Sequence, residues 1–439
     1  MSEPAGASKA PRRRAGKHSG AVPVALLTYS VKPRGGVVHT LALAEALHAD
    51  GYPVRVFALG EPGAGFYRTV RAPVTIVPAP PTLPTLEERV FASVDVLTGA
   101  LARQVAAYPV MHAQDCISAR AACAVRDTGP ASRPVVISDA STAGGPVVMR
   151  HASTAGGPVV MRHASTAGGP VVIRTVHHVD DFTSPSLIEC QERAIVEPDR
   201  VLVVSEHWRR RLQQQYGVKP DVVHNGVDAG RFRTPDPSLA GQLRQRAGAD
   251  ERPLILSVGG VEPRKGSDTL VRALAALCES GRDPVLAVVG GHSFQDYRAY
   301  ADRVLAMIPE LGLRPGRDVI QLGTVPDAEL PAWYAAADVL AFPSTKEGWG
   351  LAVLEAMSAG LPVVTSDLPV FLEYLRPGRD ALVVPVGDAA ALARALAAVL
   401  DDPALAARLR AAGLAVSRRF TWARSAREHR AIYAGVAAR

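Results

Sequence analysis

One segment in the second half of the sequence constrains the fold more than any other. Residues 336–342 form a mostly apolar run that ends at Pro343, as a buried β-strand would. Gly348 and Gly350 then precede a helical pattern of apolar residues that stops at Gly360. The pattern therefore predicts a strand, a glycine-rich turn and a helix in direct succession, as in a layered α/β protein.

Two glutamates bracket the predicted N-terminus of this helix. Glu347 and Glu355 are eight residues apart, which places their side chains about 80° apart around a helix. Backbone N–H groups at a helix N-terminus can bind an anion, and carboxylates accept hydrogen bonds from hydroxyl groups. A phosphate joined to a polyol describes a nucleotide sugar, so we predict a site for one here. The alternative is a crossover helix that carries two solvated glutamates.

The composition agrees with a large enzyme and argues against nucleic-acid binding. A chain of 439 residues with 48% hydrophobic content usually forms two or three domains. The net charge is +7, but five cationic side chains and one glutamate lie within residues 1–20. We expect this segment to be a disordered basic tail, with a weak peripheral contact to anionic membranes as its one membrane role. The remaining charge is too dispersed for a duplex-binding surface.

The sequence also predicts a cytoplasmic location. No stretch approaches the roughly 18 consecutive apolar residues of a membrane-spanning helix. The apolar residues after the basic tail include Pro23 and lead to Lys32 without a cleavage site of small residues, so we expect a first β-strand there and no signal peptide. The four cysteines show no C-x-x-C spacing and are expected to be reduced thiols.

From residue 21 onward, predicted strands and helices alternate, which favours parallel sheets covered on both faces. After residue 228 the sequence becomes rich in polar and charged residues, as expected of a linker. The predicted parts are an N-terminal Rossmann-like domain at 21–228, a linker at 229–252, a second Rossmann-like domain at 253–416 and a C-terminal helix at 417–439 that packs back toward the first domain.

Residues 139–174 consist of three tandem, nearly identical copies of a 12-residue unit. This period is too short for the usual solenoid repeats, and the near-identity points to duplication within the gene. Only the last copy needs to lead into a strand predicted at Val171. We therefore assign the repeats no function.

A second glycine-rich turn follows another predicted strand. It contains Gly259, Gly260, Arg264 and Lys265, and it leads into a helix that Ser267 is expected to cap. The G-K-[ST] order of a P-loop is absent, and no strand is followed by the G-x-G-x-x-G of dinucleotide-binding enzymes. Arg264 can bind a phosphate through two hydrogen bonds, and Lys265 adds a point charge. We predict a second anion-binding turn, with an exposed cationic turn as the alternative.

Further short motifs accompany these two turns. They are Gly35-Gly36-x-x-His39, His112-Ala-Gln-Asp115, Thr175-Val-His177, Val204-Ser205, Asn225-Gly-Val-Asp228, the turn from Gly259-Gly260 to Gly266, and Gly323-Thr-Val325. In this order, and with Glu347-x7-Glu355 followed by Gly360-Leu361-Pro362, they resemble the retaining nucleotide-sugar glycosyltransferases of family 4, which have the GT-B fold. The resemblance covers the chain from about residue 21 to its end.

The resemblance implies an α/β fold of GT-B architecture, in which two Rossmann-like domains face each other across an active-site cleft. The C-terminal domain would bind the nucleotide-diphosphate sugar, and the N-terminal domain would bind a small-molecule, lipid or glycan acceptor. The implied reaction is transfer of a hexosyl-type sugar with retention of anomeric configuration. It would need no metal ion and no cofactor besides the donor.

The resemblance also implies roles for individual residues. Arg264 and Lys265 would stabilise the diphosphate leaving group, Glu347 would contact the transferred sugar and Glu355 would bind the ribose hydroxyls. His177 would lie beside the anomeric carbon. The remaining donor contacts would come from backbone N–H groups around Gly36, Gly348, Gly350 and Leu351, and from Val325 near the base. Many relatives have an arginine where this chain has Gly260, and we expect Arg264 to supply that charge.

Several alternatives stay open at this point. The segment 177–181 has two histidines and two aspartates that suit a divalent ion. Neighbouring residues at a strand end point to opposite faces, so we expect no metal there. His112 and Asp115 are expected to form a hydrogen-bonded pair, with acceptor contact as the alternative. A GT-B-fold nucleotide-sugar epimerase or hydrolase, or a non-catalytic nucleotide-sugar sensor, would share the donor contacts without transferring the sugar to an acceptor.

Overall fold

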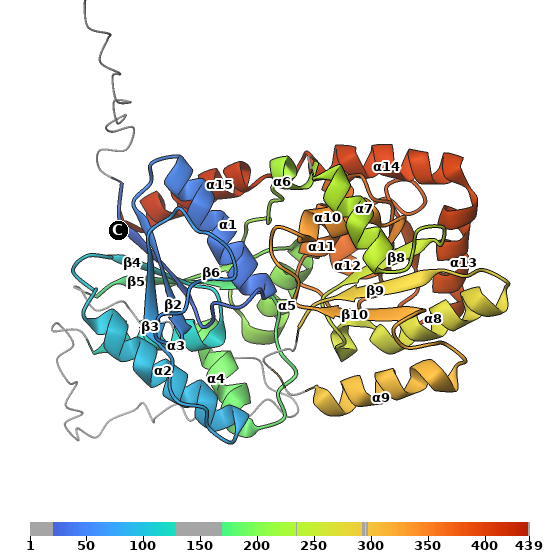
Figure 1. Cartoon of the computed structure of the whole chain (residues 1–439). Coiled ribbons are helices and arrows are strands. Elements are labelled where there is room, and N and C mark those ends of the chain that lie inside the picture. The colour runs from blue at the N-terminus through green and yellow to red at the C-terminus, as the bar shows by residue number, and fades with distance from the viewer. Residues whose placement is uncertain (1–20, 129–168, 234, 292–294, 296, 438–439) are drawn as a thin grey trace, which may run out of the picture.

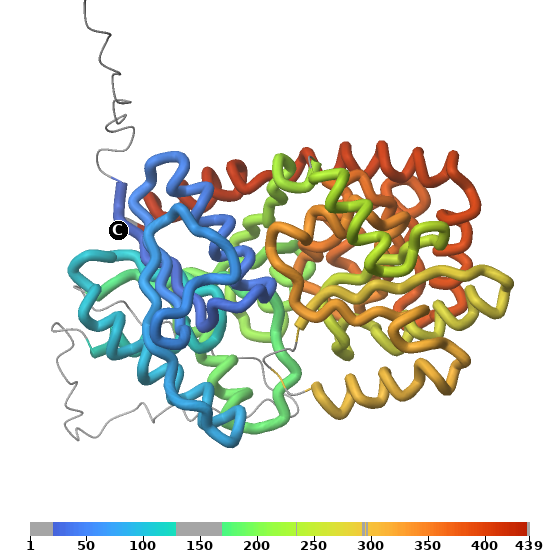
Figure 2. The backbone as a smooth tube through the Cα atoms, in the orientation of Figure 1, coloured from blue at the N-terminus to red at the C-terminus, as the bar shows by residue number. Residues whose placement is uncertain are grey.

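The molecule has two α/β lobes that lie side by side, each built on a sheet of parallel strands (Figures 1 and 2). The computed structural model describes residues 21–128, 169–233, 235–291, 295 and 297–437. The basic tail and most of the 12-residue repeats lie outside the described residues. The last repeat does lead into a strand at Val171, as predicted. The two Rossmann-like sheets confirm the predicted fold class.

The N-terminal lobe is built on a parallel sheet of seven strands in the order β3-β2-β1-β4-β5-β6-β7. Its first strand in the sequence, β1, is buried along its whole length, because Ala25 and Leu27 pack on one face and Val24 and Leu26 on the other. The strands are β1 (Val24–Thr28), β2 (Val54–Gly60), β3 (Val74–Pro78), β4 (Val110–Ala113), β5 (Val171–Val176), β6 (Arg200–Val203) and β7 (Asp221–Val222).

Helices from both ends of the chain cover this first sheet. They are α1 (Gly35–Ala49), α2 (Leu86–Ala102), α3 (Cys116–Asp127), α4 (Pro185–Val196), α5 (Glu206–Tyr216) and the C-terminal α15 (Trp422–Ala437). In Figure 1, α15 returns from the C-terminal lobe to lie beside α1. Tyr433 and Ala426 of α15 are fully buried in the same hydrophobic cluster as Leu41 of α1. The C-terminal helix is therefore part of the N-terminal lobe.

The C-terminal lobe repeats the design with six parallel strands in the order β10-β9-β8-β11-β12-β13. The strands are β8 (Leu254–Val258), β9 (Val285–Val289), β10 (Val319–Gly323), β11 (Val339–Phe342), β12 (Val363–Ser366) and β13 (Leu382–Val384). The helices around them are α8 (Ser267–Glu279), α9 (Arg298–Glu310), α10 (Leu330–Ala336), α11 (Leu351–Ala359), α12 (Pro369–Leu372), α13 (Ala389–Asp401) and α14 (Pro403–Ser417).

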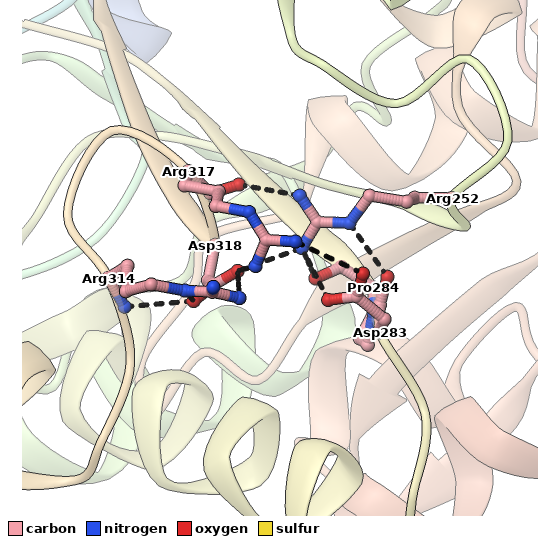
Figure 3. A network of polar contacts seen from close by, with 6 residues as sticks. All are labelled: Arg252, Asp283, Pro284, Arg314, Arg317 and Asp318. Atoms are coloured by element: carbon pink, nitrogen blue, oxygen red, sulfur yellow. Dashed lines mark hydrogen bonds and ion pairs between the residues drawn. The ribbon is translucent and has the colours of Figure 1, made fainter.

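The segment expected to be a polar linker, 229–252, is more structured than that. It contains α6 (Ala229–Arg233) and α7 (Pro237–Arg246). At its end, Arg252 donates hydrogen bonds of 2.8 Å to the carboxylates of Asp283 and Asp318 (Figure 3). Arg314 donates to the same Asp318 at 2.8 Å. These contacts lie where β8, β9 and β10 begin, so they fasten the edge of the sheet opposite to its carboxyl ends.

The strand order reverses once in each sheet, between β1 and β4 and between β8 and β11. In open parallel sheets, ligands bind at the carboxyl ends of the strands at such a point, because loops there diverge and leave a crevice. Predicted motifs lie at or just after the carboxyl ends of these four strands and of β5, β6, β7 and β10. We propose domain boundaries near residues 228 and 253, where the chain leaves the first sheet and enters the second.

Candidate functional site

The two predicted anion-binding turns meet at the carboxyl edge of the second sheet. A short 3-10 helix (Pro263–Lys265) follows β8, and the loop with Glu347 follows β11. The Lys265 ammonium and the Glu347 carboxylate are 2.5 Å apart, and the Arg264 guanidinium is 3.6 Å from the same carboxylate oxygen. The Ser344 hydroxyl donates to that oxygen at 3.0 Å. Residues 82 positions apart in the sequence thus form one compact charged cluster.

The cluster is largely shielded from solvent, which strengthens the electrostatic interactions between its charged groups. The side chains of Lys265 and Glu347 are only 11% and 9% exposed. Burial lowers the pKa of Lys265, although Glu347 opposes the change. Burial by itself would raise the pKa of Glu347, but the adjacent Lys265 and Arg264 hold it below its usual value. The carboxylate is therefore ionised and paired, which a buried charge requires.

Close packing of backbone explains why glycines surround the cluster. Gly266 has φ +63°, and an added Cβ there would overlap the carbonyl oxygen of Pro343. Gly260 has φ +76° and faces the carbonyl of Gly291, 2.8 Å from where a Cβ would lie. A side chain at position 260 would therefore be strained.

The helix predicted after β11 is observed, and no side chain caps its first turn. Helix α11 starts at Leu351, and its cap, Gly350, has φ +86° and offers no side-chain hydrogen bond. Glu355 lies half-buried on this helix and accepts a hydrogen bond of 2.9 Å from the Tyr334 hydroxyl. Burial raises the pKa of Glu355, although Tyr334 opposes the change. Val325, the residue predicted near the base, is half-buried and packs against the hydrophobic cluster that contains Tyr334.

The N-terminal lobe contributes His177 to the same place. This residue follows β5, and its Nε2 atom lies 3.2 Å from the Gln114 amide oxygen. A Cβ on Gly36 would be 3.6 Å from the imidazole, so the first turn of α1 lies directly against it. Burial lowers the pKa of His177 to about 3, with help from His178 and Arg174. The imidazole is therefore neutral at physiological pH and can hydrogen-bond a hydroxyl group.

Several contacts join the two lobes around this point. An added Cβ on Gly348 would overlap the carbonyl oxygen of His177, so the two chain segments touch. Lys346 and Asp181 form an ion pair of 2.7 Å between the lobes. Figure 1 places β5 and α11 in neighbouring lobes, and these contacts bring their loops together. The structure thus brings Arg264, Lys265, Glu347 and Gly348 together with His177 and Gly36. Glu355 lies further along α11, where it is bonded to Tyr334.

The two histidines of 177–181 have separate partners. His177 bonds to Gln114, whereas His178 Nε2 lies 3.3 Å from Asp180. Among the described residues, no three His, Cys, Asp or Glu side chains are grouped so that they could hold a metal ion.

The predicted pair of His112 and Asp115 is wrong. His112 is fully buried, and its two ring nitrogens lie 2.7 Å from the hydroxyls of Tyr433 and Thr175. Asp115 instead caps α3 by accepting a hydrogen bond of 2.8 Å from the backbone of Ser118. The cap expected at Ser267 is also wrong. That residue lies inside the helix, whose cap is Gly266, and its hydroxyl bonds to the backbone of Glu262.

Four histidines form a buried cluster below the site. The His39 ring centroid lies 4.7 Å from that of His177 and 6.0 Å from that of His429, which comes from α15. The His112 ring is 5.5 Å from His429. Burial is the main cause that lowers the pKa of all four, to about 4 for His429. The cluster is therefore neutral at pH 7 and joins α15 to the strand ends.

This cluster predicts a loss of stability on acidification. A histidine whose folded pKa lies below the unfolded value of about 6.5 stabilises the fold above that pH and loses this contribution as the pH falls. When the pH is lowered from 7 to 5, the unfolding free energy of both proteins should fall. The fall should be about 2 kcal/mol smaller for His429→Gln than for the wild type. Urea unfolding at both pH values measures this, with His48→Gln on the exposed end of α1 as the control. Equal pH dependence in all three proteins would contradict the assignment.

Some residues of the site were not identified from the sequence. Trp208, Tyr334 and Ser344 each hydrogen-bond one of the two glutamates. Gln114, which holds the His177 ring, belongs to the His112-Ala-Gln-Asp115 motif, but that motif does not indicate this contact. Ser344 is three residues before Glu347, and that spacing was a usable signal. Nothing in the sequence pattern connects Trp208 to Glu347, 139 residues away.

Comparison with known proteins gives two family matches along the chain. The Glycosyltransferase Family 4 model matches residues 142–231, and the model for Glycosyl transferases group 1 matches residues 241–415. The first match covers part of the N-terminal lobe, and the second covers most of the C-terminal lobe, including both glutamates. No helix among the described residues is long and apolar enough to cross a membrane.

Two curated relatives illustrate the sequence similarity. The GDP-mannose-dependent alpha-(1-6)-phosphatidylinositol monomannoside mannosyltransferase of Mycolicibacterium smegmatis is 34% identical over 49% of this chain and 57% of its own length. The D-inositol 3-phosphate glycosyltransferase of Streptomyces scabiei is 34% identical over 58% of each chain. The chain thus spans less than two thirds of the length of these relatives.

Solved structures extend the similarity to the whole fold. Sucrose-phosphate synthase from Thermosynechococcus elongatus superposes with a TM-score of 0.73 at 22% identity, over 95% of this chain and 99% of that one. Anabaena HepE in complex with UDP-glucose gives a TM-score of 0.69 at 19% identity, over 95% and 99%. The family models and the two-lobed architecture lead to one conclusion: the chain has the GT-B fold and matches the sequence models of the family 4 and group 1 glycosyltransferases.

Proposed function

We propose that this chain transfers a hexosyl sugar from a nucleotide-diphosphate donor to an acceptor, with retention of anomeric configuration and without a metal ion. The observation that carries the proposal is the cluster of Arg264, Lys265 and Glu347 at the switch point of the second sheet. It lies next to the uncapped N-terminus of α11 and against His177 of the other lobe. Cations, a helix N-terminus and a carboxylate suit a diphosphate bonded to a sugar.

Each of these groups has a role in the proposed reaction. Arg264, Lys265 and the backbone N–H groups that begin α11 stabilise the negative charge that grows on the departing diphosphate. Glu347 binds a hydroxyl of the transferred sugar, and Glu355 binds the ribose hydroxyls. The neutral imidazole of His177 hydrogen-bonds a sugar hydroxyl near the anomeric carbon. Gly36 and Gly348 allow the backbone to approach the donor, and Val325 lies near its base.

The stereochemistry follows from how Glu347 is held. Lys265 and Ser344 already engage its carboxylate, so we propose a binding role and not a nucleophilic one. The acceptor hydroxyl then attacks the anomeric carbon on the face from which the diphosphate departs. The bond from carbon to the phosphate oxygen breaks, the bond to the acceptor oxygen forms, and the acceptor proton passes to the departing phosphate. Retention results without a covalent enzyme intermediate.

The relatives also narrow the proposed acceptor. One is named for a phosphatidylinositol monomannoside acceptor and several for D-inositol 3-phosphate. We propose an acceptor with a polyol and a phosphate, either as a free small molecule or as a lipid headgroup.

A thermal-shift screen with UDP-, GDP- and ADP-sugars tests donor binding. A ligand that binds only the folded state at 100 times its Kd adds about 2.7 kcal/mol of stability. We expect one nucleotide base to raise the unfolding midpoint clearly more than the other two. No shift with any of the three would contradict the proposed donor site.

Removal of metal ions should leave the reaction intact. Two cations and a helix N-terminus supply the charge that Mg²⁺ provides in other phosphate-transfer sites, so turnover in excess EDTA should stay within about twofold of the untreated rate. The assay follows release of the nucleoside diphosphate. Loss of activity that a single divalent ion restores would contradict the metal-independent mechanism and would direct attention to Asp180 and Asp181.

A further inference from the structure

We propose that Trp208 of the N-terminal lobe is a positioning residue that holds Glu347 in place for binding the transferred sugar. The inference rests on the proposed function, since it concerns the same donor site. It adds that the N-terminal lobe, which does not hold the donor, helps to fix the position of the Glu347 carboxylate. The indole N–H of Trp208 donates a hydrogen bond of 2.9 Å to the backbone carbonyl of Glu347.

The hydrogen bond is a buried contact between the lobes. Trp208 is 1% exposed and lies on α5, whereas Glu347 belongs to the loop after β11. One hydrophobic cluster contains Trp208 and Leu212 of α5 together with Trp349 and Phe371 of the C-terminal lobe. A hydrogen bond inside such a cluster is well directed, and losing it leaves a buried carbonyl without its donor.

The first turn of α5 is itself fastened to the C-terminal lobe. The backbone N–H groups of Glu206 and His207 donate to the Glu373 carboxylate at 2.9 and 2.6 Å. The Ser205 hydroxyl caps the Trp208 backbone at 3.3 Å, and the Arg211 guanidinium lies 5.0 Å from the indole centroid. The ring therefore has little freedom to move away from Glu347.

A second contact fixes the next residue of the same loop. Gly348 lies so close to the His177 carbonyl that there is no room for a Cβ. The peptide between Glu347 and Gly348 is thus held by Trp208 on one side and by His177 on the other. The Glu347 side chain is held separately by Lys265 and Ser344. Backbone contacts from the N-terminal lobe and side-chain contacts from the C-terminal lobe together set the position of the carboxylate.

This arrangement predicts a selective effect on ligand binding. In the proposed function, Glu347 binds the sugar, whereas the diphosphate is bound by cations and by the first turn of α11. Trp208→Phe keeps an aromatic ring but removes the N–H donor. It should weaken binding of a nucleotide sugar about fivefold to tenfold, because a displaced Glu347 carboxylate largely loses its hydrogen bond to the sugar. Binding of the corresponding nucleoside diphosphate, which lacks the sugar, should stay within about twofold of wild type.

Calorimetric titration tests this with the nucleotide sugar that stabilises the wild type most and with its nucleoside diphosphate. Trp333→Phe is the matched control, because Trp333 is fully buried and its indole N–H has no hydrogen-bond partner among the described residues. The control should bind both ligands as the wild type does. If Trp208→Phe does not fold, Glu373→Ala replaces it, since it releases the first turn of α5 and should change the same ratio.

The outcomes separate the two proposals. Selective loss of nucleotide-sugar affinity in Trp208→Phe supports the positioning role. Equal loss for both ligands shows a general structural effect and overturns it, as does unchanged affinity for both. A wild-type chain that binds no nucleotide sugar overturns the proposed function together with this inference.

Discussion

Replacing Gly348 with alanine should lower sugar transfer by at least about 100-fold, the cost of displacing reacting groups by around 1 Å. The added methyl group would overlap the carbonyl oxygen of His177, so the donor loop and the strand end cannot keep their present separation. The lobes must shift apart or the loop must deform. Overpacking of this kind costs about 1–3 kcal/mol of unfolding free energy, so the variant should still fold.

Steady-state turnover of the donor, with thermal unfolding measured alongside, checks this expectation. Gly241→Ala is the matched control, because Gly241 lies in helix α7 with no neighbouring atom within 4 Å of an added Cβ. Its turnover should equal that of the wild type. If Gly348→Ala were as active as the control, the close approach of the two lobes could not be part of the working enzyme.

Replacing Lys265 with alanine should lower donor turnover at least tenfold, because it removes about 1.5–3 kcal/mol of charge-assisted bonding to the leaving group. It should also destabilise the fold by about 3–5 kcal/mol, since the Glu347 carboxylate is then buried without its closest cation. Lys219→Ala, at an exposed position after α5, is the control and should change neither quantity.

A double variant separates the two effects of Lys265. Lys265→Met with Glu347→Gln removes both charges and keeps most of the side-chain volume, so much of the lost stability should return. Turnover should stay low, because neither group can then act on the donor. Recovery of turnover together with stability would show that the ion pair is a structural contact only.

Local sequence patterns predicted the elements of the C-terminal lobe well. The strand before Pro343 and the helix that ends at Gly360 are observed at β11 and α11, because backbone demands near a tight turn act over a few residues. Glycines were informative where φ is positive, as at Gly266 and Gly350. The two-lobed fold followed from the alternation of strands and helices.

Pairings across long sequence distances could not be predicted in this way. The contacts of His112 with Tyr433 and of Trp208 with Glu347 join residues 321 and 139 positions apart. Each depends on how a whole helix packs, which no local pattern encodes. The prediction that His112 pairs with Asp115 is wrong for this reason. The C-terminal helix α15 packs against β4, and its Tyr433 hydroxyl bonds to His112 instead.

Release of nucleoside diphosphate from the preferred nucleotide sugar, with and without an acceptor, tests the central claim most directly. Inositol phosphate and phosphatidylinositol vesicles serve as the two acceptor probes, and nuclear magnetic resonance of the product reports the anomeric configuration. We predict release that depends on one of these acceptors and a product that retains the configuration of the donor. Equally fast release without any acceptor would identify a hydrolase or an epimerase, and donor binding without any turnover would identify a sensor; either result would contradict the account.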